Sequence, residues 1–214
     1  EIDGIERIRL GSLEPGIITE EFAEGIAKLP KMCPHFHLSL QSGCDATLKR
    51  MNRRYTSSEY AEKCELLRKY FPNPALTTDV IVGFPGETEE EFEQTKAYLE
   101  HIHFYEMHIF KYSKRKGTRA AVMPDQIDEQ IKAVRSEKLI ALGHDMSKEF
   151  RKFYIGKNEE VLFEEKAVIG DKEYFVGYTK EYVKVAKKTD ENLENQIVSG
   201  CISGMLTDEI LLFE

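Results

Sequence analysis

Short apolar segments alternate with helical segments through the first half of this chain, and this alternation limits its fold more than any other feature. Apolar segments typical of strands lie at residues 7–13, 35–40, 76–82 and 106–112. Segments with helical spacing of apolar residues lie between them, at residues 20–29, 57–70 and 88–102. A strand and a helix that recur about every thirty residues indicate parallel βα units, and so a twisted sheet or part of a barrel.

Two of these helices carry signals for their first residue. Thr19 is a suitable N-cap for the first helix. Thr88 precedes an acidic run and has Glu91 three residues on, which is the pattern of a capping box.

Polar or glycine-rich residues follow every expected strand, at residues 12–14, 41–43, 83–86 and 111–113. In parallel α/β folds, ligands bind beyond the carboxyl ends of the strands. The pattern therefore favours a ligand site at this edge. The alternative is that these residues only form the turns that any strand needs.

The turn after the third strand reads GFPGE and does not have the pattern of a phosphate loop. Four glutamates at the start of the next helix would repel a phosphate group. A flat, neutral ligand packed on Ile81, Gly83 and Phe84 is the better interpretation, because a glycine lets a ligand approach the backbone.

The four cysteines are scattered, at positions 33, 44, 64 and 201, which is typical of a reduced, cytoplasmic protein. Cys33, His35 and His37 alternate, so one strand face could present three metal ligands. Core or pocket-lining roles are the alternative, and we expect no metal ligands among them. No apolar run is long enough to cross a membrane, and the first ten residues lack the pattern of a signal peptide.

The chain changes character after Met123. Residues 124–157 form one long segment with helical spacing. Short alternating segments then follow at residues 160–165, 174–187, 196–206 and 209–214, which predict a small β-barrel. We place the domain boundary between residues 150 and 151, with domains 1–150 and 151–214.

The net charge of −8 argues against general nucleic-acid binding. Locally, period-two counting places Tyr178, Lys180, Tyr182 and Lys184 on one strand face, where rings and cations suit a single-stranded nucleic acid. An ordinary exposed strand face is the alternative. Two further basic clusters follow strand ends, and they comprise Lys49, Arg50, Arg53 and Arg54, and Lys111, Lys114, Arg115, Lys116 and Arg119.

Five ordered stretches resemble one known family. They are RIRLGSLEP, HFHLSLQSGCDATLKRMNRRYT, TTDVIVGFPGETEEEF, FKYSKRKGTRAAVMPDQ and the C-terminal β segment. The chain resembles the tRNA methylthiotransferases of the radical S-adenosylmethionine (SAM) superfamily. SLEP and SLQSG are most similar to the branch that acts on N6-threonylcarbamoyladenosine in tRNA. The resemblance implies a partial parallel (β/α) barrel, followed by a small RNA-binding TRAM-like barrel.

The resemblance also implies site residues. The SAM-binding set would be Ser12, Glu14, Gln41, Ser42, Arg53, Ile81, Gly83, Phe84 and Tyr112. Arg53 suits the methionine carboxylate of SAM, and the alternative for it is a solvated cation at a helix end. The tRNA-binding set would be Lys114, Arg115, Lys116, Tyr178, Lys180, Tyr182 and Lys184.

The chain differs from the family in its cysteines, because it lacks the motifs that bind iron–sulfur clusters. The family binds a [4Fe–4S] cluster through a CxxxCxxC loop after the first barrel strand, and holds a second cluster in an N-terminal domain. Neither cysteine set is in these 214 residues. We therefore expect a C-terminal portion that lacks two barrel strands and is inactive alone. Residues 7–13 would then form an unpaired sheet edge, which predicts self-association.

Three other functions stay open. One is a methylthiotransferase for another modified adenosine or for a ribosomal protein. The second is a different (β/α) enzyme, such as a lyase or hydrolase that uses Glu14 and Asp79 as acid and base. The third is a non-catalytic RNA-binding protein. SAM binding separates the first from the other two.

Overall fold

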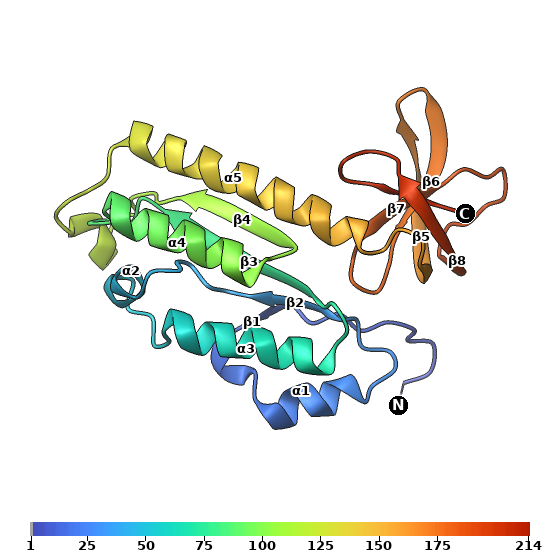
Figure 1. Ribbon diagram of the computed structural model, residues 1–214, viewed down its shortest axis with the longest axis horizontal. Helices are drawn as coiled ribbons and strands as arrows, with labels where there is room; N and C mark the ends of the chain where they lie inside the picture. Colours follow the sequence, from blue (N-terminus) through green and yellow to red (C-terminus); the bar gives the residue numbers. More distant parts are fainter. Residues whose placement is uncertain (1) are drawn as a thin grey trace. The chain divides into compact units, whose positions relative to one another are not determined.

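The computed structural model describes residues 2–214, which form two compact units. The first, which we call the α/β unit, comprises residues 10–30 and 36–146. The second, the barrel unit, comprises the residues up to Arg9, residues 31–35 and residues 147–214. Figure 1 shows the elements of both units. No helix in the described part of the chain has the length and apolar character that a membrane crossing requires.

The α/β unit is built on a four-stranded sheet with the order β1-β2-β3-β4. These strands are Ser12–Leu13, His35–Leu38, Ala75–Val82 and Glu106–Lys111. β1 pairs with β2 in parallel, β3 pairs with β4 in parallel, and a parallel bridge joins Gln41 to Val80. The parallel βα arrangement expected from the sequence is confirmed.

The helices of this unit cover one face of the sheet (Figure 1). α1 (Glu20–Ala27), α3 (Ser57–Tyr70), α4 (Glu89–Ile102) and α5 (Glu129–Lys152) supply apolar side chains to a core shared with the strands. Along β3, Val80 and Val82 belong to this core. Thr77, Asp79 and Ile81 therefore lie on the opposite face, because side chains alternate along a strand.

The capping signals are confirmed. The Thr19 hydroxyl accepts the backbone N–H of Phe22, and Thr88 and Glu91 form a reciprocal capping box. A six-residue helix, α2 (Asp45–Arg50), was not expected, because its sequence is too short to show a period. Two 3₁₀ turns, Pro15–Ile17 and Arg119–Val122, complete the unit.

The strand expected at residues 7–13 is largely wrong. β1 contains only Ser12 and Leu13, and Ile8 makes an isolated bridge to Met32 instead. The reason is that Arg7 turns toward the barrel unit's own strands, where its guanidinium donates to the backbone oxygens of Tyr178 at 2.9 Å and Glu160 at 2.7 Å. The sheet edge is thus two residues long, and self-association stays a prediction.

The barrel unit contains a closed five-stranded barrel with the order β5-β6-β7-β9-β8. In chain order, β5 to β9 are Asn158–Ile169, Lys172–Tyr178, Lys184–Lys187, Gln196–Met205 and Leu211–Phe213. A small β-barrel was expected and is confirmed. The single strand expected at residues 174–187 is wrong, because a turn separates β6 from β7 and Tyr182 adopts φ +68° there.

Candidate ligand site at the strand ends

A cavity of about 580 Å³ opens at the carboxyl ends of β3 and β4, and we call it the strand-end cavity. This volume lies in the range of cofactor pockets, about 300–1,000 Å³. Its walls include Gln41, Asp79, Ile81, Phe84, Phe110, Tyr112 and Arg115. Four of the nine residues expected to bind SAM therefore line one cavity, namely Gln41, Ile81, Phe84 and Tyr112.

The wall of this cavity contains one unsatisfied polar atom. The Tyr112 hydroxyl is buried and has no hydrogen-bond partner within residues 2–214. The Tyr112 ring packs edge-on against Phe84 with centroids 5.3 Å apart. A buried hydroxyl without a partner costs free energy, so a polar ligand atom at this wall would be stabilising.

The turn at residues 83–87 is held by a buried ion pair. The Gly83 N–H donates to Glu87 Oε2 at 2.7 Å, and Arg135 Nη1 donates to the same oxygen at 2.7 Å. Burial raises the pKa of Glu87, and the Gly83 N–H and the Arg135 guanidinium oppose this rise without cancelling it. These contacts fix the backbone next to Phe84, a wall of the cavity.

Gly83 has a different neighbour from the one expected. It adopts φ +70°, and a Cβ at this position would lie 2.3 Å from Cγ of Lys132. The close approach that we assigned to a ligand is therefore made by the Lys132 side chain. The glycine is needed both for this contact and for its left-handed backbone.

The other expected SAM ligands lie outside the lining of the strand-end cavity. Ser42 is fully buried, and its hydroxyl pairs with Thr95 Oγ1 at 3.1 Å and accepts the Cys44 N–H. Ser12 in β1 and Glu14 directly after it are exposed, and Arg53 is half-buried after α2. The structure does not bring these four together with Gln41 and Ile81 around one cavity.

Tyr55 holds the carboxyl end of β2 and was missed by sequence reasoning. Its hydroxyl lies 2.8 Å from the backbone oxygen of Ser39 and 2.9 Å from that of Leu40. Burial raises the pKa of Tyr55 to about 12, with smaller opposing effects from the charges of Arg53 and Glu14. Glu14 and Arg53 thus act on one hydroxyl at this strand end, next to Gln41.

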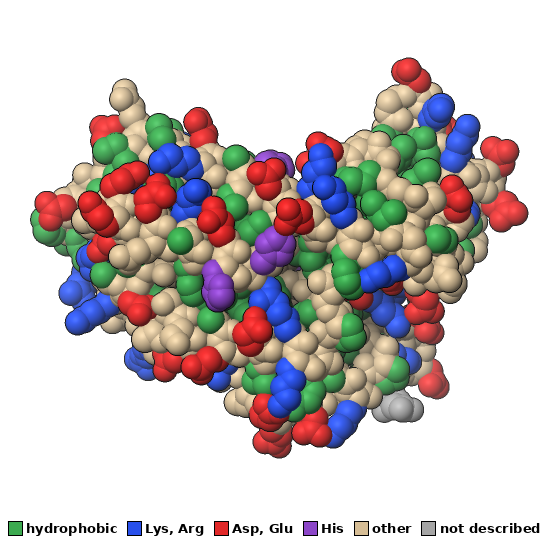
Figure 2. Space-filling model, viewed as in Figure 1, with side chains coloured by type: hydrophobic (Ala, Val, Ile, Leu, Met, Phe, Trp, Pro, Cys, Tyr) green, Lys and Arg blue, Asp and Glu red, His purple; other side chains and the backbone are tan. Residues whose placement is uncertain are grey.

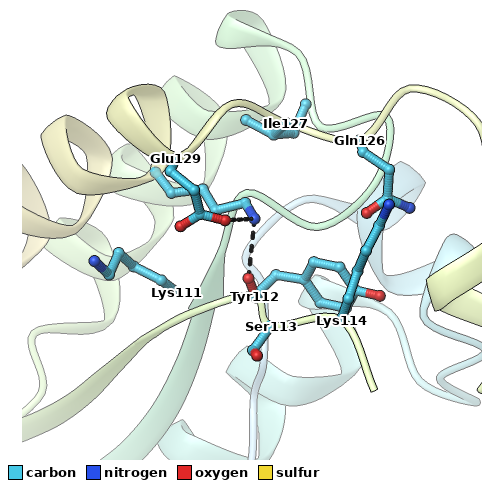
Figure 3. A pocket seen from close by; sticks show the side chains of 8 residues that line it. Lys111, Tyr112, Ser113, Lys114, Gln126, Ile127 and Glu129 are labelled. Carbon is cyan, nitrogen blue, oxygen red and sulfur yellow. Dashed lines mark hydrogen bonds and ion pairs between the residues drawn. The ribbon is translucent and has the colours of Figure 1, made fainter. Parts of the chain in front are cut away.

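A second cavity of about 440 Å³ shares Lys111, Tyr112 and Ser113 with the strand-end cavity, and Figure 3 shows its lining. Three of its eight lining residues are lysines, namely Lys111, Lys114 and Lys132. Lys132 Nζ donates to the backbone oxygen of Tyr112 at 3.0 Å and pairs with Glu129 at 2.7 Å. We call it the lysine cavity.

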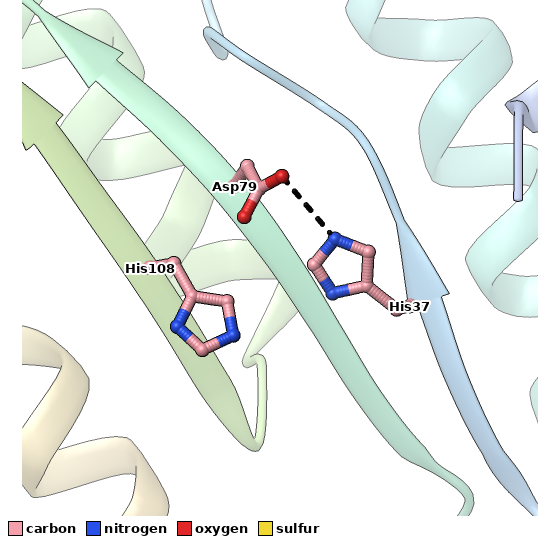
Figure 4. A group of neighbouring side chains, drawn as sticks. All are labelled: His37, Asp79 and His108. Atoms are coloured by element: carbon pink, nitrogen blue, oxygen red, sulfur yellow. Dashed lines mark ion pairs between the residues drawn. The ribbon is translucent and has the colours of Figure 1, made fainter. Parts of the chain in front are cut away.

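Three ionisable side chains meet on the sheet face opposite the helices (Figure 4). His37 comes from β2, Asp79 from β3 and His108 from β4, and their ligand atoms lie within 4.8 Å of one another. Sequence reasoning singled out His37 and Asp79 separately but missed the group. The signal was the shared period-two face of each strand, although strand register decides which residues meet.

The residues expected to bind tRNA fall into two places. Lys114, Arg115 and Lys116 are exposed in the loop after β4. In the barrel unit, Tyr178 and Tyr182 stack with centroids 4.3 Å apart, Arg9 covers the Tyr182 ring at 4.0 Å, and Lys180 pairs with Glu160 at 3.1 Å.

The prediction that Tyr178, Lys180, Tyr182 and Lys184 share one face of a single strand is wrong. Tyr178 and Lys184 are cross-strand partners on β6 and β7, with Lys180 and Tyr182 in the turn between them. Acidic and basic side chains are mixed over the face of the molecule that Figure 2 shows.

The four cysteines of the chain are free thiols in the structure. Cys33, Cys44 and Cys64 are buried and Cys201 is half-buried. The group of three potential metal ligands found within residues 2–214 contains no cysteine. Burial raises the pKa of the Cys64 thiol to about 12, which disfavours the thiolate that an iron–sulfur cluster needs.

Comparison with known proteins agrees with this architecture. Residues 2–99 match the radical SAM superfamily. The chain is 43% identical over 92% of its length to threonylcarbamoyladenosine tRNA methylthiotransferase MtaB of Bacillus subtilis, covering 44% of that protein. It is 39% identical over 97% of its length to a tRNA-2-methylthio-N(6)-dimethylallyladenosine synthase of Acetivibrio thermocellus, covering 43% of it.

A solved structure supports the fold. Coproporphyrinogen III oxidase of Escherichia coli superposes with a TM-score of 0.55 at 16% identity, over 65% of this chain and 32% of that one. The chain spans less than half the length of the curated relatives named above.

Proposed function

This chain belongs to the tRNA methylthiotransferases of the radical SAM superfamily, and we propose that it forms the SAM-binding and tRNA-facing portion of such an enzyme. The reaction would add a methylthio group to C2 of N6-threonylcarbamoyladenosine next to the anticodon. The observation that carries the proposal is the strand-end cavity, whose size and walls suit a nucleoside cofactor.

The SAM nucleoside would pack against apolar walls formed by Ile81, Phe84 and Phe110. Gln41 and the unsatisfied Tyr112 hydroxyl would hydrogen-bond to its polar atoms. Bound SAM would supply the methyl group of the product. We also propose Glu14 and Arg53 for the methionine part of SAM, with Arg53 at its carboxylate, and neither side chain lines the strand-end cavity itself.

We further propose that the ligands of the [4Fe–4S] clusters come from parts of the full-length protein other than these 214 residues. Three of the four cysteines are buried and the sequence has no CxxxCxxC loop, which supports this proposal, so the cluster chemistry would belong to those other parts. The chain alone would then leave SAM uncleaved. The reaction would take place in the cytoplasm, where tRNA is modified.

The tRNA would approach the strand ends, where Lys114, Arg115 and Lys116 are exposed. The barrel unit would act as the TRAM-like RNA-binding module, with Lys184 and the stacked Tyr178 and Tyr182 on its surface. Tyr182 is already covered by Arg9, so a base would add to an existing stack.

The test is activity of the full-length protein, reconstituted with iron and sulfide, on tRNA that bears threonylcarbamoyladenosine or dimethylallyladenosine. Mass spectrometry of the digested nucleosides identifies the product. A methylthio adduct on threonylcarbamoyladenosine alone supports the proposal. An adduct on dimethylallyladenosine alone would support the same enzyme family with a different substrate. The similarity to the Acetivibrio protein makes dimethylallyladenosine the second candidate substrate. No adduct, with SAM uncleaved, overturns the proposal.

The cavity assignment gives a separate prediction. Ser113 is exposed and lines the strand-end cavity, so Ser113→Trp should fill the cavity without disturbing the core. We expect SAM binding by the reconstituted full-length protein to weaken by about tenfold or more, or at least about 1.4 kcal/mol. Isothermal titration calorimetry measures this, with Ser113→Ala as the matched control that keeps its affinity. Equal affinity in both variants would place SAM elsewhere.

A further inference from the structure

His37, Asp79 and His108 come together because three neighbouring strands present them on one face (Figure 4). The β3–β4 register places Asp79 directly opposite His108. His37 Nε2 lies 3.4 Å from Asp79 Oδ2, and the His37 and His108 rings have centroids 5.8 Å apart. Two imidazoles and one carboxylate are thereby gathered around one point on rigid strands.

The spacing fits a tetrahedral metal ion. Ligand bonds of about 2.0–2.1 Å at tetrahedral angles separate two ligand atoms by about 3.3 Å. The separation between His37 Nε2 and Asp79 Oδ2 is 3.4 Å. All three ligand atoms lie within 4.8 Å of one another, and His108 is exposed.

A buried hydroxyl orients one of the ligands. His37 Nδ1 lies 2.9 Å from Thr77 Oγ1, and Thr77 is 2% exposed. In the tautomer that donates Nδ1–H to this hydroxyl, His37 presents the lone pair of Nε2 on the side of Asp79. Metal-binding histidines characteristically have such a partner on the second ring nitrogen. A simple His–Asp ion pair would not require His108.

We propose that His37, Asp79 and His108 form a binding site for a divalent transition-metal ion of the Zn²⁺ type. Two imidazoles and a carboxylate are the protein ligands of open zinc sites, which keep a fourth position for water or substrate. Asp79 also lines the strand-end cavity, so that fourth position would face a molecule bound there. The site does not depend on the proposed methylthiotransferase function.

The test uses the 214-residue chain, stripped with a chelator and titrated with Co²⁺, whose visible spectrum reports coordination geometry. We expect one equivalent to bind with a tetrahedral spectrum, and Zn²⁺ to displace it. Asp79→Asn, which keeps the shape of the side chain, should abolish the spectrum. Thr77→Val should weaken binding by about 10–100-fold, because it removes only the orienting hydroxyl.

Two control variants separate this site from adventitious binding. His144→Ala removes an exposed histidine on α5, and Cys201→Ser removes the half-buried thiol. Both should bind Co²⁺ as the parent does, and thermal melting without metal checks that every variant folds. A six-coordinate spectrum would overturn the assignment to an ion of the Zn²⁺ type. Binding that survives Asp79→Asn, or that Cys201→Ser abolishes, would overturn the proposal.

Discussion

Replacement of Arg135 by methionine is expected to destabilise the α/β unit by about 3–5 kcal/mol, because it leaves a buried carboxylate without its cation. The side chains of Arg135 and Glu87 are only 6% and 2% exposed. Arg135 Nη1 also donates to the backbone oxygen of Glu87, and its Nη2 donates to Glu89 at 3.0 Å. Urea denaturation followed by circular dichroism measures the loss.

Lys138→Met is the matched control for this substitution. Lys138 also comes from α5 and pairs with Glu89 and Glu93, but its side chain is 44% exposed. Exposed pairs contribute about 0–1 kcal/mol, so this variant should unfold nearly as the parent does. Equal losses in the two variants would show that burial of the Arg135 pair has no special effect on stability.

The pH dependence of the Arg135 variant has a definite sign. The pKa of Glu87 is raised in the folded state, chiefly by burial. A raised folded-state pKa contributes stability below the unfolded pKa, and that contribution is lost as the pH rises through the folded pKa. Without Arg135 the pKa rises further, so the deficit of Arg135→Met should be larger at neutral than at acidic pH.

Truncation of Phe163 is expected to unfold the barrel unit selectively. Phe163 is fully buried on β5 and packs edge-on against Phe213 with centroids 5.5 Å apart. Phe→Ala in a core costs about 3–5 kcal/mol, which is comparable to the whole stability of a small domain. Hydrogen exchange should show loss of protection in residues 158–213, with the core of the α/β unit retained.

The same variant tests how function is divided between the units. If the barrel unit contributes tRNA affinity, full-length Phe163→Ala should lose tRNA binding and keep SAM binding. Phe153→Ala, which removes a ring that is 46% exposed, is the control and should retain both. Full protection of the barrel in Phe163→Ala, or unchanged tRNA affinity after the barrel unfolds, would contradict the prediction.

Local patterns sufficed for much of the fold. The helices at residues 57–70 and 88–102 were expected within a residue of their observed bounds, because the apolar period of both is clear and Thr88 and Glu91 form a local cap on the second. The prediction of a strand at residues 7–13 was largely wrong, because Arg7 makes a long-range contact that overrides the apolar character of this segment. The hairpin in residues 174–187 was missed, because no glycine marks the turn at Tyr182.

The sequence by itself determined the parallel βα order, the small barrel and the family, since these depend on local period and on ordered motifs. Only the tertiary structure decided which polar residues meet. It left Ser42 inside the core, set Lys132 over Gly83, and gathered His37, Asp79 and His108 on one face. The physical reason is that strand register and packing between elements fix such distances, and neither is encoded in the residues nearby.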